Sequence, residues 1–459
     1  MISRRTASML LGSFAILAAA RPALAQRGST RMEFAGQSID AMIADFMAEN
    51  AIPGLALAIV QAPYIPRVTG YGLADTQKQL LVGSNTLFDV GQMADAYTAV
   101  AVMQLVEAEK LGLDDPIGKY LHNLPSAWRA VTVRNLLQHA SGIPDYTHEP
   151  SYDPTRGYDL AALIALTGAK SLTFQPGYDV ADSTTDYALL ARIVAAASRQ
   201  RYRDFVRRNQ FARLGLRQTL FSSEMERVKS EKVEHNSNRH KHFLAEADLI
   251  NPTELATGYR ADGDRLSPAA TAGPSANSIL VSAMDVSIWD IGLAGGILVT
   301  DPALRAILYQ PGTLADGRSV PVMGGWRFPG RKGLMYITGN GHGHSAFLSR
   351  FTDPSELVCV TLLANKEGLD LTQLARQIAG AYDKRLGPPL TEGMRMQQSP
   401  YAVRQTVERF VTVLRDMNIA VVADNDSNTS PQPPTAERIT FVEPAVTKRT
   451  IRAMVWEQD

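Results

Sequence analysis

Two short stretches of the sequence hold side chains that could transfer protons or bind a metal ion. Gln92 and Asp95 lie three residues apart in a segment with helical character, so both side chains fall on one helix face. Much later, His342 and His344 alternate at a spacing that suits one face of a strand. If Asp182 joined them, two carboxylates and an imidazole could form an acid–base pair or bind a divalent cation. The alternative is that Asp95 caps or pairs with a nearby base and the histidines lie on a wet strand edge.

The elements that would position these residues follow from hydrophobic patterning. Helices are expected at 37–49, 91–110, 188–198, 282–293 and 371–386. Strands are expected near both ends of this span, at 54–60, 66–73, 333–338, 347–351 and 357–363. Strands from distant parts of the chain with helices between them predict an α+β fold, an antiparallel sheet flanked by helices with a helical lobe.

Several blocks combine into a specific pattern. They are Ile52-Pro53-Gly54, Gly70-Tyr71-Gly72-Leu73-Ala74-Asp75, Thr86-Leu87-Phe88, residues 132–146 (TVRNLLQHASGIPDY), Gly324-Gly325-Trp326 and Leu362-Leu363-Ala364-Asn365. Together they resemble the serine β-lactamase and penicillin-binding-protein-like family, which includes class C β-lactamases, D-alanyl-D-alanine peptidases and related esterases. The resemblance covers residues 37–387. It implies a cleft between the sheet and the helical lobe, with no cofactor.

The family's catalytic Ser-x-x-Lys follows the Thr-Leu-Phe block, because the lysine amine must lie beside the serine hydroxyl to activate it. In this chain Gln92 stands at the serine position and Asp95 at the lysine position. An amide cannot accept an acyl group as that serine does, and no Ser-x-x-Lys occurs elsewhere in the chain. The resemblance therefore implies a degenerate catalytic motif.

The family's other two motifs are altered as well. Its Tyr-x-Asn loop precedes a Gly-Tyr-Ala-Leu-Leu helix, and here Asp182 and Thr184 stand at the tyrosine and asparagine positions. Its Lys/His-Thr/Ser-Gly strand motif aligns in two ways. One places the family histidine at His342 with His344 in place of the glycine, and the other places the motif at Asn340-Gly341-His342.

Three functional hypotheses follow. In the first, the chain is a pseudoenzyme that binds a small molecule, a peptide, a cell-wall fragment or a protein partner in the former active-site cleft, around Gln92, Asp95, Asp182, Asn340, His342 and His344. In the second, the cleft is a non-standard hydrolase site, either Asp/His or metal-assisted. In the third, the nucleophile has moved to another serine, for which the candidates by proximity are Ser141, Ser183 and Ser345.

Composition and the N-terminal residues limit the possible partners and the cellular location of the protein. The 459 residues carry no formal net charge, which argues against nucleic acid as a partner. Residues 1–25 predict a signal peptide, whose apolar run is too short for a stable membrane span. Ser3-Arg4-Arg5 indicates twin-arginine export, and the ordinary secretory route is the alternative because the usual Phe-Leu after the arginines is missing. A periplasmic or secreted location is therefore expected. The single cysteine, Cys359, lies in an apolar run and is expected to be buried.

Two segments fall outside the catalytic motifs. Residues 222–248 are rich in mixed charges and include His240-x-His242, a spacing compatible with a metal but more typical of a solvated surface excursion. Residues 388–459 form a C-terminal extension, with a helix expected at 401–417 and a flexible linker near 424–434. The segment from Arg438 to Trp456 could be an added strand or a disordered tail.

Overall fold

The computed structural model describes most of the chain between residues 32 and 388. The described ranges are 32–61, 64–153, 158–167, 170–225, 255–263, 265–270, 278–331, 333–352 and 358–388, with the strands at 420–424 and 438–442. The predicted signal peptide, the 401–417 helix and the His240-x-His242 pair lie outside these residues.

The chain divides into two compact units. One comprises residues 50–375, and the other comprises residues 1–49 and 376–459. Within the second unit, the described elements are β1 (Glu33–Phe34), β2 (Gln37–Ser38), α2 (Ile39–Glu49), η9 (Lys384–Leu386), β18 (Ala420–Asp424) and β19 (Arg438–Val442). The helix α12 (Thr372–Tyr382) leads from one unit into the other.

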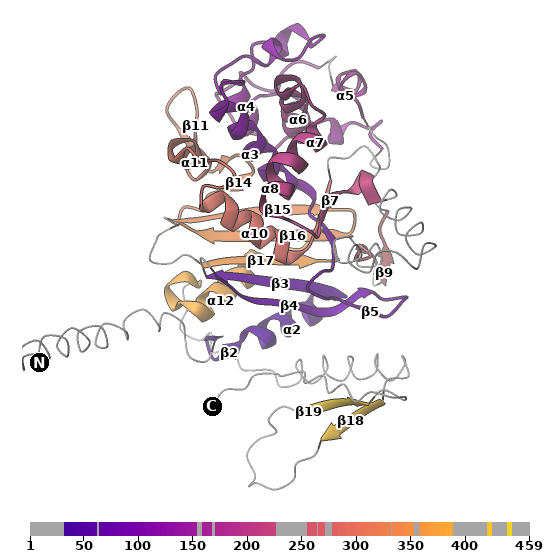
Figure 1. The fold of residues 1–459 in the computed structure, drawn as a ribbon. Helices are drawn as coiled ribbons and strands as arrows, with labels where there is room; N and C mark the ends of the chain where they lie inside the picture. The colour runs from indigo at the N-terminus through magenta and orange to yellow at the C-terminus, as the bar shows by residue number, and fades with distance from the viewer. Residues whose placement is uncertain are drawn as a thin grey trace, which may run out of the picture. The chain divides into compact units, whose positions relative to one another are not determined.

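The unit of residues 50–375 is built on an antiparallel sheet with the strand order β13-β14-β15-β16-β17-β3-β4-β5 (Figure 1). Its long strands are β3 (Gly54–Gln61), β4 (Tyr64–Asp75), β15 (Leu334–Gly341), β16 (His344–Phe351) and β17 (Val358–Ala364). Its short strands are the two edge strands β5 (Leu80–Leu81) and β13 (Val322–Met323), and β14 (Trp326–Arg327) between β13 and β15. Early and late parts of the chain meet where β17 pairs with β3, with Leu362 opposite Leu57. Every residue of β16 and β17 is buried, so these strands are covered on both faces.

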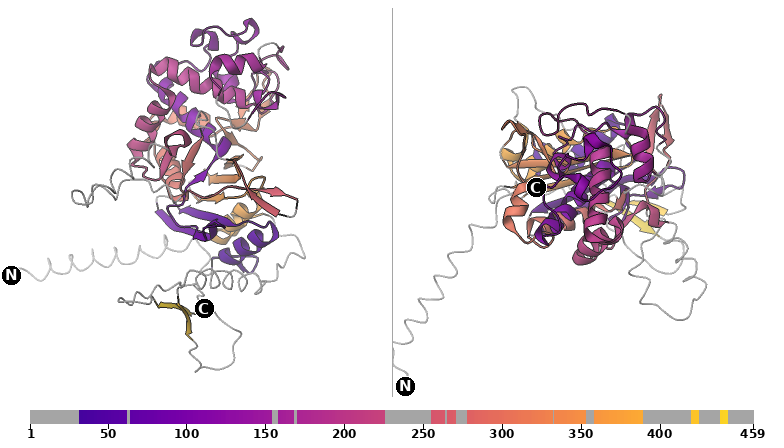
Figure 2. Two further views of the ribbon diagram at one scale, coloured as in Figure 1. Left: turned by 90° about the vertical axis from the view of Figure 1, so that its right-hand side faces the viewer. Right: turned by 90° about the horizontal axis from the view of Figure 1, so that it is seen from above.

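Helices cover the sheet and form a lobe beyond its β15 side (Figures 1 and 2). The sheet-covering helix α10 (Ala283–Ala294) packs on β3 and β17. The remaining helices are α3 (Ala94–Glu107), α4 (Val133–Leu137), α5 (Leu160–Thr167), α6 (Thr184–Ser198), α7 (Tyr202–Val206), α8 (Ala212–Leu214) and α11 (Pro302–Leu308). Short helical turns are η1 (Gly91–Met93), η2 (Ile117–Lys119), η3 (Ser126–Trp128), η4 (Tyr146–His148), η5 (Arg207–Phe211) and η6 (Ser222–Glu224).

Short strand pairs complete this unit. A three-stranded sheet has the order β6 (Phe88–Asp89), β10 (Ile279–Val281) and β7 (Thr219–Phe221). Two-stranded pairs join β8 (Tyr259–Asp262) to β9 (Arg265–Pro268) and β11 (Gly312–Thr313) to β12 (Ser319–Val320).

The central helix α3 is buried on nearly all sides. Of its residues, all but Asp95, Val106 and Glu107 are buried. Its small side chains allow close packing, and Tyr97 stacks on Trp289 of α10 with ring centroids 4.3 Å apart. The helix therefore fixes the direction of Asp95, the one polar group near its start that is not enclosed.

The α+β prediction is confirmed, since the sheet is antiparallel and joins strands from both ends of the unit. The helix expected at 91–110 is observed as η1 followed by α3. The alternatives left for Arg438–Trp456 are partly resolved, because Arg438–Val442 pairs with Ala420–Asp424 as an antiparallel strand. The predicted linker near 424–434 begins at the last residue of β18, and its remainder lies outside the described residues. Cys359 is buried in β17.

Candidate active-site cleft

A cleft of about 1290 Å³ lies between the helical lobe and the tip of the β15–β16 hairpin. Of the residues predicted from the sequence, it is lined by Gln92, Asp95, Thr184, Asn340 and His342. Asp182 and His344 are not among its lining residues. The structure therefore brings most of the altered motif positions to one cavity.

Gln92 lies at the mouth of the cleft on η1. Its Oε1 accepts a hydrogen bond from the backbone N–H of Asn340 over 2.8 Å, which ties η1 to the end of β15. The preceding Gly91 has φ +49°, and a Cβ there would lie 2.7 Å from the carbonyl oxygen of Asn340. Glycine thus allows the hairpin to approach η1 closely enough for this contact.

Asp95 lies one turn further on, at the start of α3, and faces the same cleft. Burial raises the pKa of its carboxyl group to about 7, and the negative charges of Asp186 and Asp182 act in the same direction. The positive charges of His139 and Arg327 oppose the rise. A carboxyl group that holds its proton near neutrality cannot replace the permanent cation that the resemblance implied for this position.

Asp182 lies near Asp95 but is not among the residues that line the cleft. Its Oδ2 lies 2.6 Å from the guanidinium of Arg327, and the two side chains are 60% and 40% exposed. Asp182 is thus paired with Arg327, and both charges act on the carboxyl group of Asp95. Thr184 begins α6, and its backbone N–H donates to Asp145 Oδ2 over 2.9 Å.

His342 occupies the hairpin turn, not a strand as the alternating spacing predicted. Gly341 pairs with His344, so His342 and Gly343 are the two loop residues, with φ +51° and +80°. Positive φ at both positions is the signature of a type I′ turn. A Cβ on Gly343 would lie 2.3 Å from the backbone of Gly258, so glycine is required there. The turn places the His342 side chain at the cleft, 25% exposed.

A buried carboxylate lies directly behind His342. The Nδ1 atom of His342 is 3.1 Å from Oδ2 of Asp89, a residue of β6 that is 4% exposed. The other oxygen of Asp89 accepts from Ser278 Oγ over 2.6 Å and from the Gly91 N–H over 2.9 Å. Burial alone would raise the pKa of Asp89, but the contact with His342, the charges of His342 and His344, and the hydrogen bond from Ser278 together lower it. Asp89 therefore remains a carboxylate against which an imidazole can be held.

His344 lies beneath the turn instead of lining the cleft, because it follows the turn as the first residue of β16. Its ring is 4% exposed and contacts Phe88 edge-on, with centroids 6.0 Å apart. Its Nδ1–H donates to the carbonyl oxygen of His342 over 3.0 Å. Burial lowers the pKa of His344, so the ring is neutral and acts as a structural clamp on the turn.

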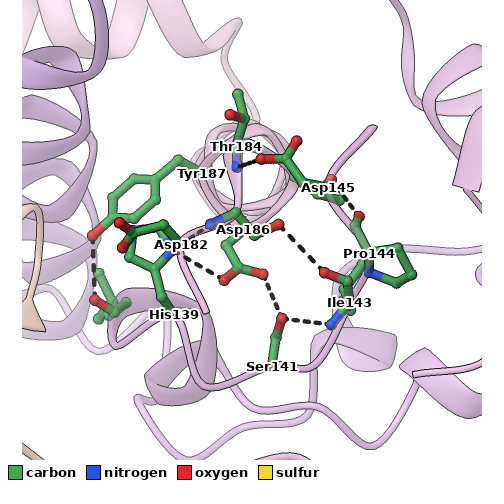
Figure 3. Close-up of polar contacts among 12 residues, drawn as sticks. His139, Ser141, Ile143, Pro144, Asp145, Asp182, Thr184, Asp186 and Tyr187 are labelled. Atoms are coloured by element: carbon green, nitrogen blue, oxygen red, sulfur yellow. Dashed lines mark hydrogen bonds and ion pairs between the residues drawn. The ribbon is translucent and has the colours of Figure 1, made fainter. Parts of the chain in front are cut away.

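A second carboxylate is buried within the lobe, where Asp186 of α6 joins the block of residues 132–146 (Figure 3). Asp186 Oδ1 accepts from Ser141 Oγ over 2.5 Å, and its Oδ2 lies 3.2 Å from His139 Nδ1. His139 ends α4 with φ +54°, and the Ala140 N–H bonds back to the Asn135 carbonyl oxygen. Burial alone would lower the pKa of His139, but the bond to Asp186 raises it. This network fixes a helix end usually made with glycine.

The three serines considered as relocated nucleophiles are all buried outside the cleft lining. Ser141 donates to Asp186, Ser183 donates to the Ile143 carbonyl oxygen over 3.3 Å, and Ser345 donates to Asn340 Oδ1 over 3.3 Å. Among the described lining residues the serines are Ser223, bonded to Arg203, and Ser278, bonded to Asp89. None of these hydroxyls contacts a lysine, tyrosine or histidine that could remove its proton.

The far wall of the cleft is aromatic and mixed in charge. Tyr146, Tyr152 and Tyr158 pack against one another with ring centroids 5.5–5.9 Å apart, and all three line the cleft. The charged lining residues of the lobe are Asp159, Arg192, Arg201, Arg203, Asp204, Arg207 and Glu224. Such a wall offers ring faces and both signs of charge to a ligand.

Sequence reasoning missed Asp89, Asp186 and the three tyrosines. Asp186 stands beside the apolar run Tyr187–Leu190, and an acid in that position is a detectable sign of a buried partner. Asp89 follows the Thr-Leu-Phe block, but only the three-dimensional structure reveals that the hairpin turn lies over it.

Within the described ranges, no three His, Cys, Asp or Glu side chains are grouped so as to hold a metal ion. In the same part of the chain, no helix combines the length and apolar character needed to cross a membrane.

Solved structures share the arrangement of this fold. The octameric penicillin-binding protein homologue from Pyrococcus abyssi aligns with 92% of this chain and 96% of its own, at a TM-score of 0.60 and 20% identity. A class C β-lactamase aligns with 77% of this chain and 96% of its own, at a TM-score of 0.58 and 19% identity. At these identities the likeness establishes the fold.

The family follows from the sequence match. The model of the Beta-lactamase family matches residues 39–383, so the chain belongs to that family. Members of this family generally need no cofactor, in agreement with the prediction made from the resemblance.

Curated relatives include two proteins of Bacillus subtilis (strain 168). Penicillin-binding protein 4* is 25% identical over 306 residues, which are 65% of this chain and 64% of that protein. The putative penicillin-binding protein PbpX is 28% identical over 272 residues, 59% of this chain and 62% of that protein. The matched region thus spans a little under two thirds of each relative.

Proposed function

We propose that this chain is an exported, non-acylating member of the Beta-lactamase family that binds a peptide, a cell-wall fragment or a protein partner in its cleft. One observation carries the proposal. The side chain at the mouth of the central helix is the amide of Gln92, and its oxygen is bonded to the backbone of Asn340. One turn later the cleft presents Asp95 instead of an amine. Neither group can form or activate an acyl-enzyme.

The cleft lining supports a ligand with several functional groups. Tyrosine faces, arginines and carboxylates together suit a peptide or glycopeptide, which carries apolar, cationic and anionic parts. Two curated relatives are named as penicillin-binding proteins, which supports a ligand related to the cell wall. The Ser3-Arg4-Arg5 segment supports export to the periplasm or beyond, where such ligands occur.

The test is calorimetric titration of the purified protein with a soluble muropeptide. We expect saturable binding that is lost when Ala188, a cleft-lining residue of α6, is replaced by the bulky tryptophan in Ala188→Trp. The matched control is Ala196→Trp, an exposed position on the same helix and outside the cleft lining. Equal binding by both variants, or a covalent serine adduct, would contradict the proposal.

The contact between Asp89 and His342 favours a second candidate, a hydrolase with an Asp/His site, which was the alternative left open by the sequence.

A further inference from the structure

We infer that His342 and Asp89 form a proton-transfer dyad that lets the cleft hydrolyse carboxylic esters by direct attack of water. This inference rests on the proposed function, since it assumes a cleft without a covalent nucleophile, and goes beyond binding. Asp89 has no place in the altered family motifs discussed above.

The first support is the orientation of the imidazole. Nδ1 of His342 is buried and lies 3.1 Å from Oδ2 of Asp89, close enough for an ion pair although the ring N–H is not aligned as a hydrogen bond, whereas the side chain as a whole is 25% exposed and lines the cleft. The exposed edge of the ring is therefore the one that carries Nε2. The negative charge of a carboxylate this close to Nδ1 favours the tautomer that is protonated there, and a small rotation of the ring would align the hydrogen bond. That tautomer leaves Nε2 free to accept a proton.

The second support is the rigidity of the carboxylate. Ser278 and the Gly91 N–H satisfy Oδ1 of Asp89, so its Oδ2 is the oxygen presented to His342. A buried carboxylate held on both sides cannot rotate away without losing these hydrogen bonds. It can stabilise the imidazolium that forms when His342 takes a proton.

The third support is the backbone at His342. The first loop position of a type I′ turn favours asparagine or glycine, yet a histidine stands here with φ +51°. The neighbouring His344 clamps the carbonyl oxygen of His342 over 3.0 Å, which helps to hold this conformation. A side chain kept in a sparsely populated conformation at a cleft is a reason to look for function.

The step balances without any added reagent. Water loses a proton to Nε2 of His342 as its oxygen attacks the ester carbonyl carbon and forms a tetrahedral oxyanion. The intermediate collapses, the bond to the alcohol oxygen breaks, and the imidazolium returns the proton to that oxygen. One ester and one water become one carboxylic acid and one alcohol, and His342 ends unchanged.

The experiment measures hydrolysis of 4-nitrophenyl butyrate by the full chain and by His342→Asn, which suits the type I′ turn and so preserves the hairpin. We expect kcat to fall by roughly 100-fold or more, with KM little changed, as for loss of a general base. Asp89→Asn should lower kcat in the same way. A solvent deuterium isotope effect on kcat should be present in the unmodified protein and absent from His342→Asn. The exposed His122 provides the matched control, and His122→Asn should leave turnover unchanged.

Intact-mass measurement during turnover separates the two proposals. Dependence of turnover on His342 with no acyl adduct supports the dyad. No turnover above buffer, or equal turnover by His342→Asn and the unmodified protein, overturns the dyad but leaves the binding proposal standing. An acylated serine overturns the non-acylating proposal itself, and with it the inference that depends on it.

Discussion

The Gln92 side chain accepts a hydrogen bond from the backbone N–H of Asn340 over 2.8 Å, so a neutral amide joins the central helix to the hairpin at the mouth of the cleft. The position where a nucleophile would be free to attack is thus used for a structural contact. A second contact, between Asp89 of β6 and His342 of the hairpin turn, holds the same hairpin. The tip of the β15–β16 hairpin is therefore fixed to η1 and β6 at two points, and the cleft keeps its shape without the family's catalytic pair.

Asp95 makes stability depend on pH. The folded protein raises the pKa of this carboxyl group to about 7, so the folded state binds more protons than the unfolded state between about pH 4 and 7. The contribution of Asp95 to stability is therefore greatest below pH 4 and is lost as the pH rises to about 7. Above pH 7, Asp95→Asn should be more stable than the unmodified protein by on the order of 1–3 kcal/mol, reduced by partial exposure to the cleft.

Urea unfolding of both proteins at pH 4 and pH 8 measures this effect. The difference in free energy of unfolding between the two proteins should be small at pH 4 and should reach its expected value at pH 8. A constant difference at both pH values would show that Asp95 ionises normally.

Asp186 should be far more important for stability than Asp182, although the two lie four residues apart. Asp186→Ala leaves the buried side chains of His139 and Ser141 without their partner and should cost about 2–4 kcal/mol. Asp182→Ala removes only an exposed ion pair with Arg327 and should cost less than about 1 kcal/mol. Free energies of unfolding from urea titration compare the two, and equal losses would refute the buried network.

Gly343 should tolerate no side chain. Gly343→Ala combines a left-handed backbone with a Cβ 2.3 Å from Gly258, and should cost roughly 3 kcal/mol or more. Gly330 has a similar φ of +86° but nothing within 4 Å of its Cβ position, so Gly330→Ala should cost only about 1 kcal/mol. The thermal unfolding midpoints of the two variants measure the difference. Similar midpoints would mean that the turn is not packed against Gly258.

Restoring the missing pair should restore some covalent chemistry. The double variant Gln92→Ser with Asp95→Lys places a hydroxyl and an amine on one face of the helix start. We expect slow labelling by a fluorescent penicillin, detected on a denaturing gel and absent from either single variant. Labelling would show that the scaffold is intact, and equal labelling of either single variant would contradict a paired role for the two positions.

Much of the sheet was predictable because its strands are apolar and bounded by turns. Residues 54–60 and 358–363 of the two expected central strands are buried throughout, and such apolar runs are recognisable in a sequence without knowledge of the neighbouring strand. The start of the central helix was also predictable, since the altered Gln92 and Asp95 positions follow a block with a known place in the family.

The site was less predictable because its polar contacts cross long distances in the sequence. Asp89 and His342 come from β6 and a hairpin turn more than two hundred residues apart, and only the fold brings them together. The prediction that His342 alternates with His344 on a strand was wrong, since a two-residue turn separates the strands at that point. The ion pair of Asp182 with Arg327 could not be read from the sequence either, since the two residues lie far apart in the chain.

The most direct test of the central claim is the intact mass of the unmodified protein after prolonged exposure to excess benzylpenicillin. We predict a single species at the unreacted mass, because the cleft offers no activated hydroxyl. A species heavier by the mass of one penicillin, with the adduct mapped to Ser278 or to any other serine, would contradict the account.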